Sequence, residues 1–174
     1  MAVFLKSSFA VPRGYTMYVF VTLGTQKFQF NRLLSAVDRL AQEHPEYEIF
    51  AQTGRSDYVP QHYKFKEFLD KDEFEQHMDK ADIVVAHGGT GAIIGALKKH
   101  KRVLAVPRKE KYGEHVDDHQ KQIVQAFEKA GYIKGCMHIH DFERDFMEAV
   151  SMEPAEYKSN TEQFAKRLKE LIDE

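Results

Sequence analysis

The chain alternates between short, unbroken apolar runs and longer segments in which apolar residues recur every three or four positions. Unbroken runs of β-branched and aromatic residues are expected of strands that are buried in a parallel sheet. Four runs predict such strands, at 18–23, 47–52, 83–86 and 102–106. Two shorter runs, at 63–65 and 132–133, predict brief additional strands, the first of them at an edge.

The segments between these runs have the spacing of amphipathic helices. In the first segment the apolar positions are Phe30, Leu33, Leu34, Val37, Leu40 and Ala41. Further helices are predicted at 71–78, at 90–99 and around 123–130, followed by two closing helices. The last of these starts near Ala155, and its apolar stripe fits either a partner or the chain's own sheet. Strands that alternate with helices predict an α/β fold with a doubly wound, Rossmann-like parallel sheet.

Length and composition indicate one domain. A chain of 174 residues with 43% hydrophobic residues can bury one substantial core. The domain is expected to span 17–174, because Met17 stands directly before the first strand. Residues 1–16 are expected to be a disordered leader or vector remnant. Their apolar run is too short for a secretory signal, and 11–14 (Val-Pro-Arg-Gly) has the character of a cleavable linker.

Charge and cysteine content exclude several classes of protein. The formal net charge of −2, from 25 basic and 27 acidic residues, gives no overall attraction for nucleic acid. The single cysteine, Cys136, cannot form an internal disulfide, which favours a reducing, cytoplasmic environment. No stretch approaches the roughly 20 apolar residues of a transmembrane helix.

The segment His87-Gly88-Gly89-Thr90-Gly91 joins a predicted strand to a predicted helix. Glycine permits close backbone approach, and the first turn of a helix has unpaired N–H groups, so this loop is suited to a phosphate. The alternative is a tight turn without a ligand. The loop matches a dinucleotide fingerprint only in part, because Ile94 occupies the third glycine position, and NAD binding is therefore disfavoured.

Two other loops are expected at the same edge of the sheet. After the first strand, Gly24 permits a second backbone approach and Thr25 supplies a hydroxyl, so that two loops clasp one diphosphate. The segment 112–120 offers acceptors, amide donors and imidazoles that suit the hydroxyls of a sugar. Its candidate sugar contacts are Glu114, His115, Asp118, His119 and Gln120.

The same segment raises the question of a metal. His115 and His119 have a spacing that suits two metal ligands on one helix face, but no third ligand is evident in the sequence. Asp117 and Asp118 fit the cap of the following helix. The sequence therefore predicts no metal site.

Three segments together resemble a known family. They are 20–25 (Phe-Val-Thr-Leu-Gly-Thr), the glycine loop 87–91, and 106–108 (Val-Pro-Arg) followed by 112–120 (Tyr-Gly-Glu-His-Val-Asp-Asp-His-Gln). They resemble the C-terminal domain of glycosyltransferase family twenty-eight from about Met17 to Ile133. Within it, the chain is similar to small bacterial subunits of capsular and exopolysaccharide transferases. Those subunits are similar to the catalytic subunit of the eukaryotic dolichol-linked N-acetylglucosamine transferase.

The resemblance implies the donor-binding half of a GT-B glycosyltransferase, in which a UDP-sugar lies between two Rossmann-like domains. It implies an inverting hexosyltransferase, without a cofactor, that transfers the sugar to a lipid-linked saccharide acceptor in capsular or exopolysaccharide synthesis. The other half would be a membrane-anchored, acceptor-binding partner subunit. That partner would recruit this cytoplasmic chain to the inner face of the cell membrane.

Site residues follow from the resemblance by position. Gly24 and Thr25, with the glycines and Thr90 of the glycine loop, would hold the diphosphate, while residues 118–120 would contact the sugar. His87 is a candidate for contact with a phosphate or the sugar and the one candidate for a catalytic role, and alternatively a hydrogen-bonded residue at a strand end. No residue of the chain is assigned as general base. Three basic residues are candidates to balance the donor charge or to meet lipid headgroups: Arg108, Lys109 and Lys111.

The sequence departs from the family at one position. The family usually places a glutamate on the helix after the glycine loop, where it binds the ribose hydroxyls, and the matching residue here is Gly95. A glycine in a helix costs about 1 kcal/mol relative to alanine and cannot make that contact. A non-catalytic enhancer subunit therefore stays open as a hypothesis, and the partial dinucleotide fingerprint leaves a dinucleotide-dependent oxidoreductase open as another.

Overall fold

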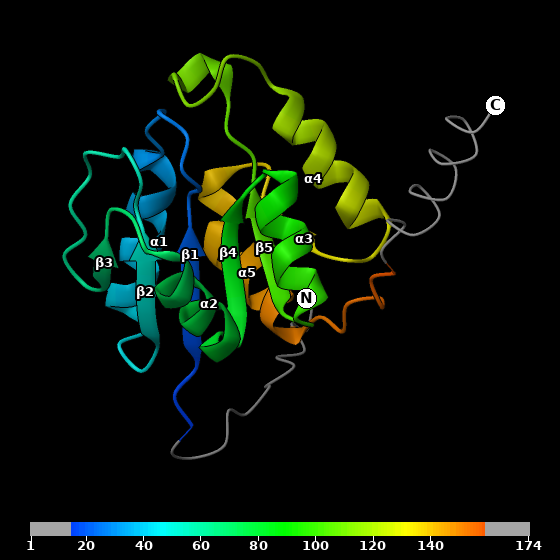
Figure 1. Cartoon of the computed structure of the whole chain (residues 1–174), viewed down its shortest axis with the longest axis horizontal. Coiled ribbons are helices and arrows are strands. Elements are labelled where there is room, and N and C mark those ends of the chain that lie inside the picture. The colour runs from blue at the N-terminus through cyan, green and yellow to red at the C-terminus, as the bar shows by residue number, and fades with distance from the viewer. Residues whose placement is uncertain (1–14, 159–174) are drawn as a thin grey trace, which may run out of the picture.

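The computed structural model describes residues 15–158, in which strands and helices alternate (Figure 1). The strands are β1 (Tyr18–Thr22), β2 (Glu48–Gln52), β3 (Lys64–Lys66), β4 (Ile83–His87), β5 (Arg102–Val106) and β6 (Lys134–Gly135). The α-helices are α1 (Asn31–Glu43), α2 (Lys71–Lys80), α3 (Thr90–Lys98), α4 (His119–Lys129) and α5 (Phe142–Ser151). Two 3-10 turns, η1 (Glu110–Tyr112) and η2 (Ile139–Asp141), precede α4 and α5.

The strands form one parallel sheet in the order β3-β2-β1-β4-β5-β6. β2 and β3 follow on one side of β1. The chain then crosses back to place β4 on the other side of β1, and β5 and β6 follow beyond β4. In the register, Phe20 of β1 lies between Phe50 of β2 and Val84 of β4. The predicted doubly wound α/β fold is confirmed. Its topological switch point, where ligands of such sheets bind, lies between β1 and β4.

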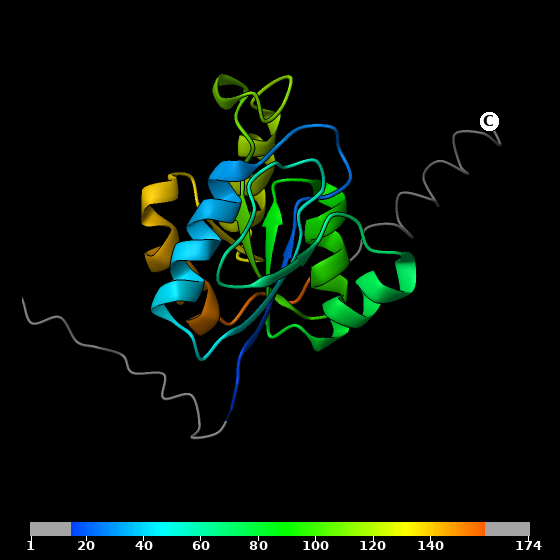
Figure 2. The same ribbon diagram turned by 90° about the vertical axis from the view of Figure 1, so that its left-hand side faces the viewer.

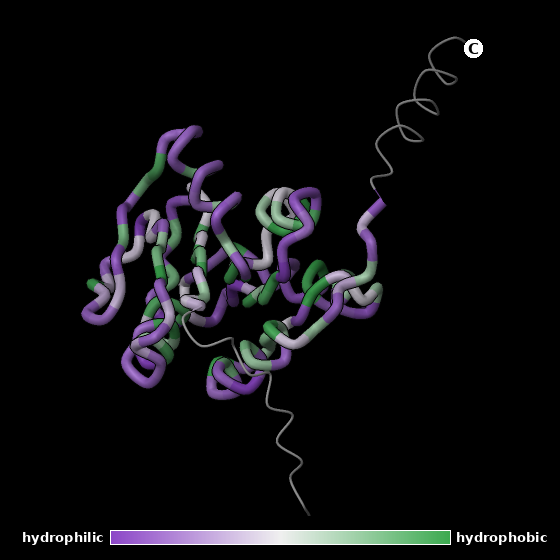
Figure 3. The backbone as a smooth tube through the Cα atoms, turned by 90° about the horizontal axis from the view of Figure 1, so that it is seen from below, coloured by the Kyte–Doolittle hydropathy of each residue, from purple (hydrophilic) through white to green (hydrophobic). Residues whose placement is uncertain are grey.

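Helices cover both faces of the sheet (Figure 2). Alternate residues of β1 point to opposite faces: Val19 and Val21 pack with α1 and α5, whereas Tyr18 and Phe20 pack with α2, α3 and α4. Because both faces are buried, the central strands are apolar throughout, which is why they appear as continuous runs in the sequence. Coloured by hydropathy, the strands in the middle of the molecule are mostly hydrophobic and the outer loops mostly hydrophilic (Figure 3).

The start of α2 is fixed by a capping box. The Asp70 side chain accepts a hydrogen bond from the backbone N–H of Glu73 at 2.8 Å, and the Glu73 carboxylate accepts one from the N–H of Asp70 at 3.1 Å. This reciprocal pair satisfies two donors that the first turn of a helix otherwise leaves unpaired. It also holds Asp70 at the edge of the sheet where the carboxyl ends of the strands lie.

The short strand predicted around 132–133 is present two residues later, as β6, the last strand of the described residues. Gly131 ends α4 with a φ of +75°, and the N–H of Tyr132 bonds back to the carbonyl of Phe127. Tyr132 therefore belongs to the helix cap and cannot pair with β5. Of the two closing helices, the first is α5. The second is predicted from near Ala155; residues 155–158 are not helical, and the rest of it, like the predicted leader up to residue 14, lies outside the described residues.

Candidate functional site

His87, the last residue of β4, lies between the two glycine loops at the switch point. A Cβ atom on Gly24 would lie 2.7 Å from Cε1 of His87, and a Cβ atom on Gly89 would overlap its Nε2. Gly24 also has a φ of +71°, which disfavours other residues. Both glycines are therefore required by the packing of the His87 imidazole, a role that the sequence did not indicate.

The His87 ring is buried and electrically neutral at pH 7. Burial, together with the positive charge of Arg108, lowers its pKa from the ordinary 6.5 to about 4. Nδ1 lies 3.4 Å from the carbonyl oxygen of Thr22, an arrangement in which Nδ1–H donates and Nε2 is left as an acceptor. His87 can therefore accept a hydrogen bond from a ligand hydroxyl, but it brings no positive charge to a phosphate.

The free energy of unfolding is expected to fall by roughly 2 kcal/mol between pH 7 and pH 4.5 through His87. A histidine with a lowered pKa in the folded state takes up its proton more readily when unfolded. Its stabilising contribution is therefore complete above about pH 6.5 and is lost as the pH falls toward 4. Urea unfolding at several pH values should show this slope in the wild type, and a flatter one in a folded His87→Gln variant.

The remaining glycines of the region serve two different purposes. Gly88 admits α4, because a Cβ there would lie 2.9 Å from Cγ2 of Val124 and 3.1 Å from the carbonyl oxygen of Gln120. Gly91 and Gly95 face open space, with no atom within 4 Å of an added Cβ. The N-cap residue of α3, Gly89, makes no side-chain cap. The first-turn N–H groups of α3 are thus available to an anion.

A cavity of about 350 Å³ lies at the switch point beside these groups. Its lining residues come from β1, β2, β4, α2, α3 and the adjoining loops: Thr22, Gly24, Thr25, Gln52, Leu69, Asp70, Lys71, Phe74, Met78, His87, Gly91, Ala92 and Gly95. The volume and the mixture of apolar walls with a few polar groups are typical of a small-molecule site. Asp70 and Lys71 were not among the predicted site residues, although the Asp-x-x-Glu pattern at 70–73 marks the start of a helix.

Only some of the predicted diphosphate-binding residues line this cavity. Gly24, Thr25, His87 and Gly91 line it, whereas 88–90 do not. Thr90 is exposed at the start of α3, and Gly88 is buried against α4. Within the loop, Gly91 thus borders the cavity, whereas Gly88 and Gly89 make room for other atoms of the chain itself.

The prediction that Arg108 meets lipid headgroups is wrong, because the residue is buried. Its side chain is only 1% exposed and donates hydrogen bonds to four backbone carbonyl groups. These belong to Leu23, Phe28, Gln29 and Glu114, at 2.8 to 3.2 Å. Arg108 therefore ties the loop after β1 to the loop before α4. The sequence carries no signal for this role, because an arginine in a loop has the same residue type and spacing whether it is buried or exposed.

Several of the predicted sugar contacts are engaged within the chain. The buried Glu114 carboxylate pairs with the guanidinium of Arg32 through two bonds of 2.8 and 2.9 Å. Oδ1 of Asp118 accepts from the N–H of Glu110, and Oε1 of the buried Gln120 accepts from the N–H of Arg108. These bonds fix the shape of the loop, and none of the predicted sugar contacts lines the cavity.

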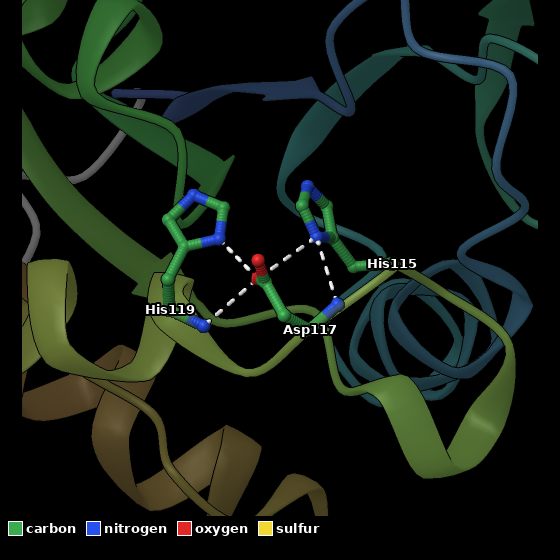
Figure 4. A group of neighbouring side chains, drawn as sticks. All are labelled: His115, Asp117 and His119. Atoms are coloured by element: carbon green, nitrogen blue, oxygen red, sulfur yellow. Dashed lines mark hydrogen bonds and ion pairs between the residues drawn. The ribbon is translucent and has the colours of Figure 1, made fainter.

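The two histidines of this loop differ in environment. His115 is buried against Phe28, with ring centroids 5.6 Å apart, while His119 is half exposed at the first position of α4. Asp117 lies between them, so the structure supplies the third potential metal ligand that the sequence analysis did not identify (Figure 4).

The strand order and the cavity at the switch point define a Rossmann-like α/β domain. Residues 18–174 match the glycosyltransferase family 28 C-terminal domain, and the chain belongs to this family. Among curated relatives, the UDP-N-acetylglucosamine transferase subunit ALG13 of Homo sapiens is 31% identical over 126 residues, which are 68% of this chain and 11% of the relative. Its Candida glabrata counterpart is 32% identical over 93 residues, or 52% of this chain and 44% of the relative. The chain thus spans between about a tenth and a half of these relatives.

Solved structures share the fold. An NMR structure of ALG13 has a TM-score of 0.60 at 20% identity, covering 84% of this chain and 92% of that one. The glycotransferase of kitacinnamycin gives 0.60 at 16% identity, covering 87% of this chain but only 39% of the enzyme. MurG of Acinetobacter baumannii gives 0.55 at 16%, covering 78% and 41%. The fold is that of one half of a GT-B glycosyltransferase. In residues 15–158, no helix is both long and apolar enough to cross a membrane.

Proposed function

We propose that this chain binds the UDP-sugar donor of a two-subunit, inverting hexosyltransferase that acts on a lipid-linked saccharide. The observation that carries the proposal is the cavity at the switch point, which meets the uncapped first turn of α3 at Gly91. The names of the relatives support N-acetylglucosamine as the first sugar to test. The resemblance to capsular and exopolysaccharide subunits supports polysaccharide synthesis as the setting.

The proposed donor lies across the carboxyl ends of β1 and β4. The diphosphate meets the first-turn N–H groups of α3, whose dipole favours negative charge. The nucleoside enters the cavity between α2 and α3, against apolar groups that include Leu69 and Phe74. The sugar extends past His87 toward His119. During transfer, the same N–H groups stabilise the charge that develops on the departing UDP.

The ribose contact is proposed to come from Asp70 in place of the missing glutamate. A ribose diol is well recognised by a carboxylate, which accepts two hydrogen bonds. Gly95 leaves open space on the α3 side of the cavity, and among the described lining residues Asp70, on the α2 side, is the one carboxylate. Its Oδ1 accepts from Glu73, so Oδ2 stays available for the ribose.

The donor site is tested by placing a negative charge at Gly91. An added side chain meets no atom within 4 Å, and an aspartate in the first turn favours the helix while repelling a diphosphate. UDP is expected to raise the melting temperature of the wild type and of the neutral, isosteric Gly91→Asn variant. Gly91→Asp should lower UDP affinity by roughly tenfold or more. Equal binding by both variants would place the diphosphate elsewhere, and stabilisation by NAD in place of UDP would favour an oxidoreductase.

The ribose contact has its own prediction. Asp70→Asn keeps a good N-cap residue, so α2 should remain intact, while UDP affinity falls by roughly tenfold through loss of a charged acceptor. The affinity for 2′-deoxy-UDP should change much less, because it lacks one of the hydroxyls. Calorimetry with both nucleotides measures the difference, and Asp72→Asn, on the same helix but outside the cavity, is the control. An equal loss for both nucleotides would exclude recognition of the diol.

The second subunit is proposed to supply the acceptor wall and the general base. The relatives are each named as a transferase subunit, which supports a partner that completes the crevice. We further propose that this partner is membrane-anchored, holds the lipid-linked acceptor and recruits the chain from the cytoplasm to the inner face of the cell membrane.

A non-catalytic enhancer remains the second candidate, and Gly95 favours it, because the usual ribose contact is absent. Transfer by the reconstituted pair of subunits separates the two. If Gly91→Asp abolishes transfer and Gly91→Asn preserves it, this chain holds the donor. Undiminished transfer by Gly91→Asp would identify an enhancer. Gln120→Ala would not separate the two candidates, because Gln120 also accepts a hydrogen bond from the backbone N–H of Arg108 and its loss would disturb the loop itself.

A further inference from the structure

The side chains of His115, Asp117 and His119 converge on the segment that leads into α4 (Figure 4). Their potential ligand atoms all lie within 4.8 Å of one another. Oδ1 of Asp117 is 3.2 Å from Nδ1 of His115 and also contacts Nδ1 of His119. We propose that these three side chains bind a divalent transition-metal ion of the zinc class.

The donor set determines the class of ion. Two imidazole nitrogens and one carboxylate oxygen suit zinc and its first-row neighbours, whereas magnesium and calcium prefer sites built from oxygen alone. Three protein ligands leave at least one coordination position for water or a ligand oxygen. The side chains of Asp117 and His119 are 55% and 48% exposed, so an ion can enter from solvent.

The ligands are held in place by the surrounding structure. His115 packs on Phe28 and meets the ring of His119 edge-to-face, with centroids 4.8 Å apart. The N–H of His119 donates to the Asp117 carboxylate at 3.1 Å. On either side, the loop is fixed by Glu114, through Arg32, and by Asp118, through the backbone of η1. Such a site loses little conformational freedom when an ion binds.

The geometry at His115 favours a cation. The N–H of Asp117 lies 3.4 Å from Nδ1 of His115, which is long for a hydrogen bond. The same Nδ1 lies 3.2 Å from Oδ1 of Asp117, so a metal ion bound by both atoms would occupy the position that a shared proton otherwise takes. Since the bond from the N–H is weak, an ion displaces it at little cost. Protons compete for the same atoms, so the affinity should fall as the pH falls.

Isothermal titration of the full chain with zinc chloride, after removal of metals by a chelator, tests the proposal without any donor. We expect one ion per chain, and a cobalt(II) complex with visible absorption bands. His119→Gln and Asp117→Asn should each weaken zinc binding by roughly tenfold or more and alter the cobalt spectrum. Their melting temperatures without metal should stay near that of the wild type, which confirms that the fold is intact.

A second pair of histidines provides the matched control. The rings of His138 and His140 lie 5.5 Å apart, and His140 is exposed beside Asp141. The double change His138→Gln with His140→Gln should leave zinc binding unchanged. The proposal is overturned if the chain binds no zinc, if His119→Gln and Asp117→Asn bind it like the wild type, or if the control variant loses it. UDP binding is measured separately, so failure of the donor proposal would remain distinguishable.

Discussion

Replacing Arg108 by methionine is expected to lower the free energy of unfolding by about 4 kcal/mol. Four backbone carbonyl groups would lose their donor, two of them in fully buried bonds, and each buried, unpaired carbonyl costs about 1–3 kcal/mol. The total is reduced because methionine fills much of the same volume and no longer buries a charge. Denaturant unfolding measures the change.

The same substitution should disturb the donor site, since Arg108 joins Leu23, next to the Gly24 turn, to the loop that carries Glu114. Lys111→Met is the control. Lys111 is exposed on η1, so its replacement should change the free energy of unfolding by no more than about 0.5 kcal/mol. Equal stability of the two variants would show that the hydrogen bonds of Arg108 contribute little.

Gly89→Ala is expected to lower the free energy of unfolding by about 3 kcal/mol, although the backbone there is ordinary. Gly89 has a φ of −82°, which any residue adopts, so strain comes only from the added methyl group. That group would overlap the His87 imidazole, which also packs closely against Gly24 and so has little room to shift. Thermal or urea unfolding measures the loss.

The contact with His87 makes this prediction specific. In a His87→Ala background the overlap is removed, so Gly89→Ala should cost far less, with a coupling energy of about 2 kcal/mol in the double-mutant cycle. Gly91→Ala, two residues later, meets no neighbouring atom and should raise stability by several tenths of a kcal/mol through helix propensity. Additive effects of Gly89→Ala and His87→Ala would exclude the proposed overlap.

These two glycines show where the sequence was informative and where it was not. The run 83–86 followed by His-Gly-Gly-Thr-Gly predicted a strand, a loop and a helix, and all three are present. Glycine in such a loop indicates that another group packs closely against the backbone, but the sequence does not identify that group. At Gly89 it is His87, at Gly88 it is α4, and only Gly91 faces the cavity.

For polar residues, too, the sequence does not show which groups they contact. Arg108, Glu114 and Gln120 look like surface groups in the sequence, yet each is buried and bonded within the chain. Asp70 and Asp117 look like ordinary helix-start residues, yet one lines the cavity and the other lies between two imidazoles. Their roles depend on contacts between segments far apart in the chain or on the local path of a loop, and neither leaves a periodic signal.

The sequence by itself determined the fold class, the alternation of strands and helices and the position of the glycine loop at the edge of the sheet. Hydrophobic periodicity records which faces are buried, and a parallel sheet with both faces buried leaves few other arrangements. Only the tertiary structure decided what each site residue touches. The neutral His87 between Gly24 and Gly89, the internal bonds of Arg108 and the convergence of His115, Asp117 and His119 all depend on how the loops pack. Side-chain packing in loops follows from three-dimensional contacts that residue type and spacing do not encode.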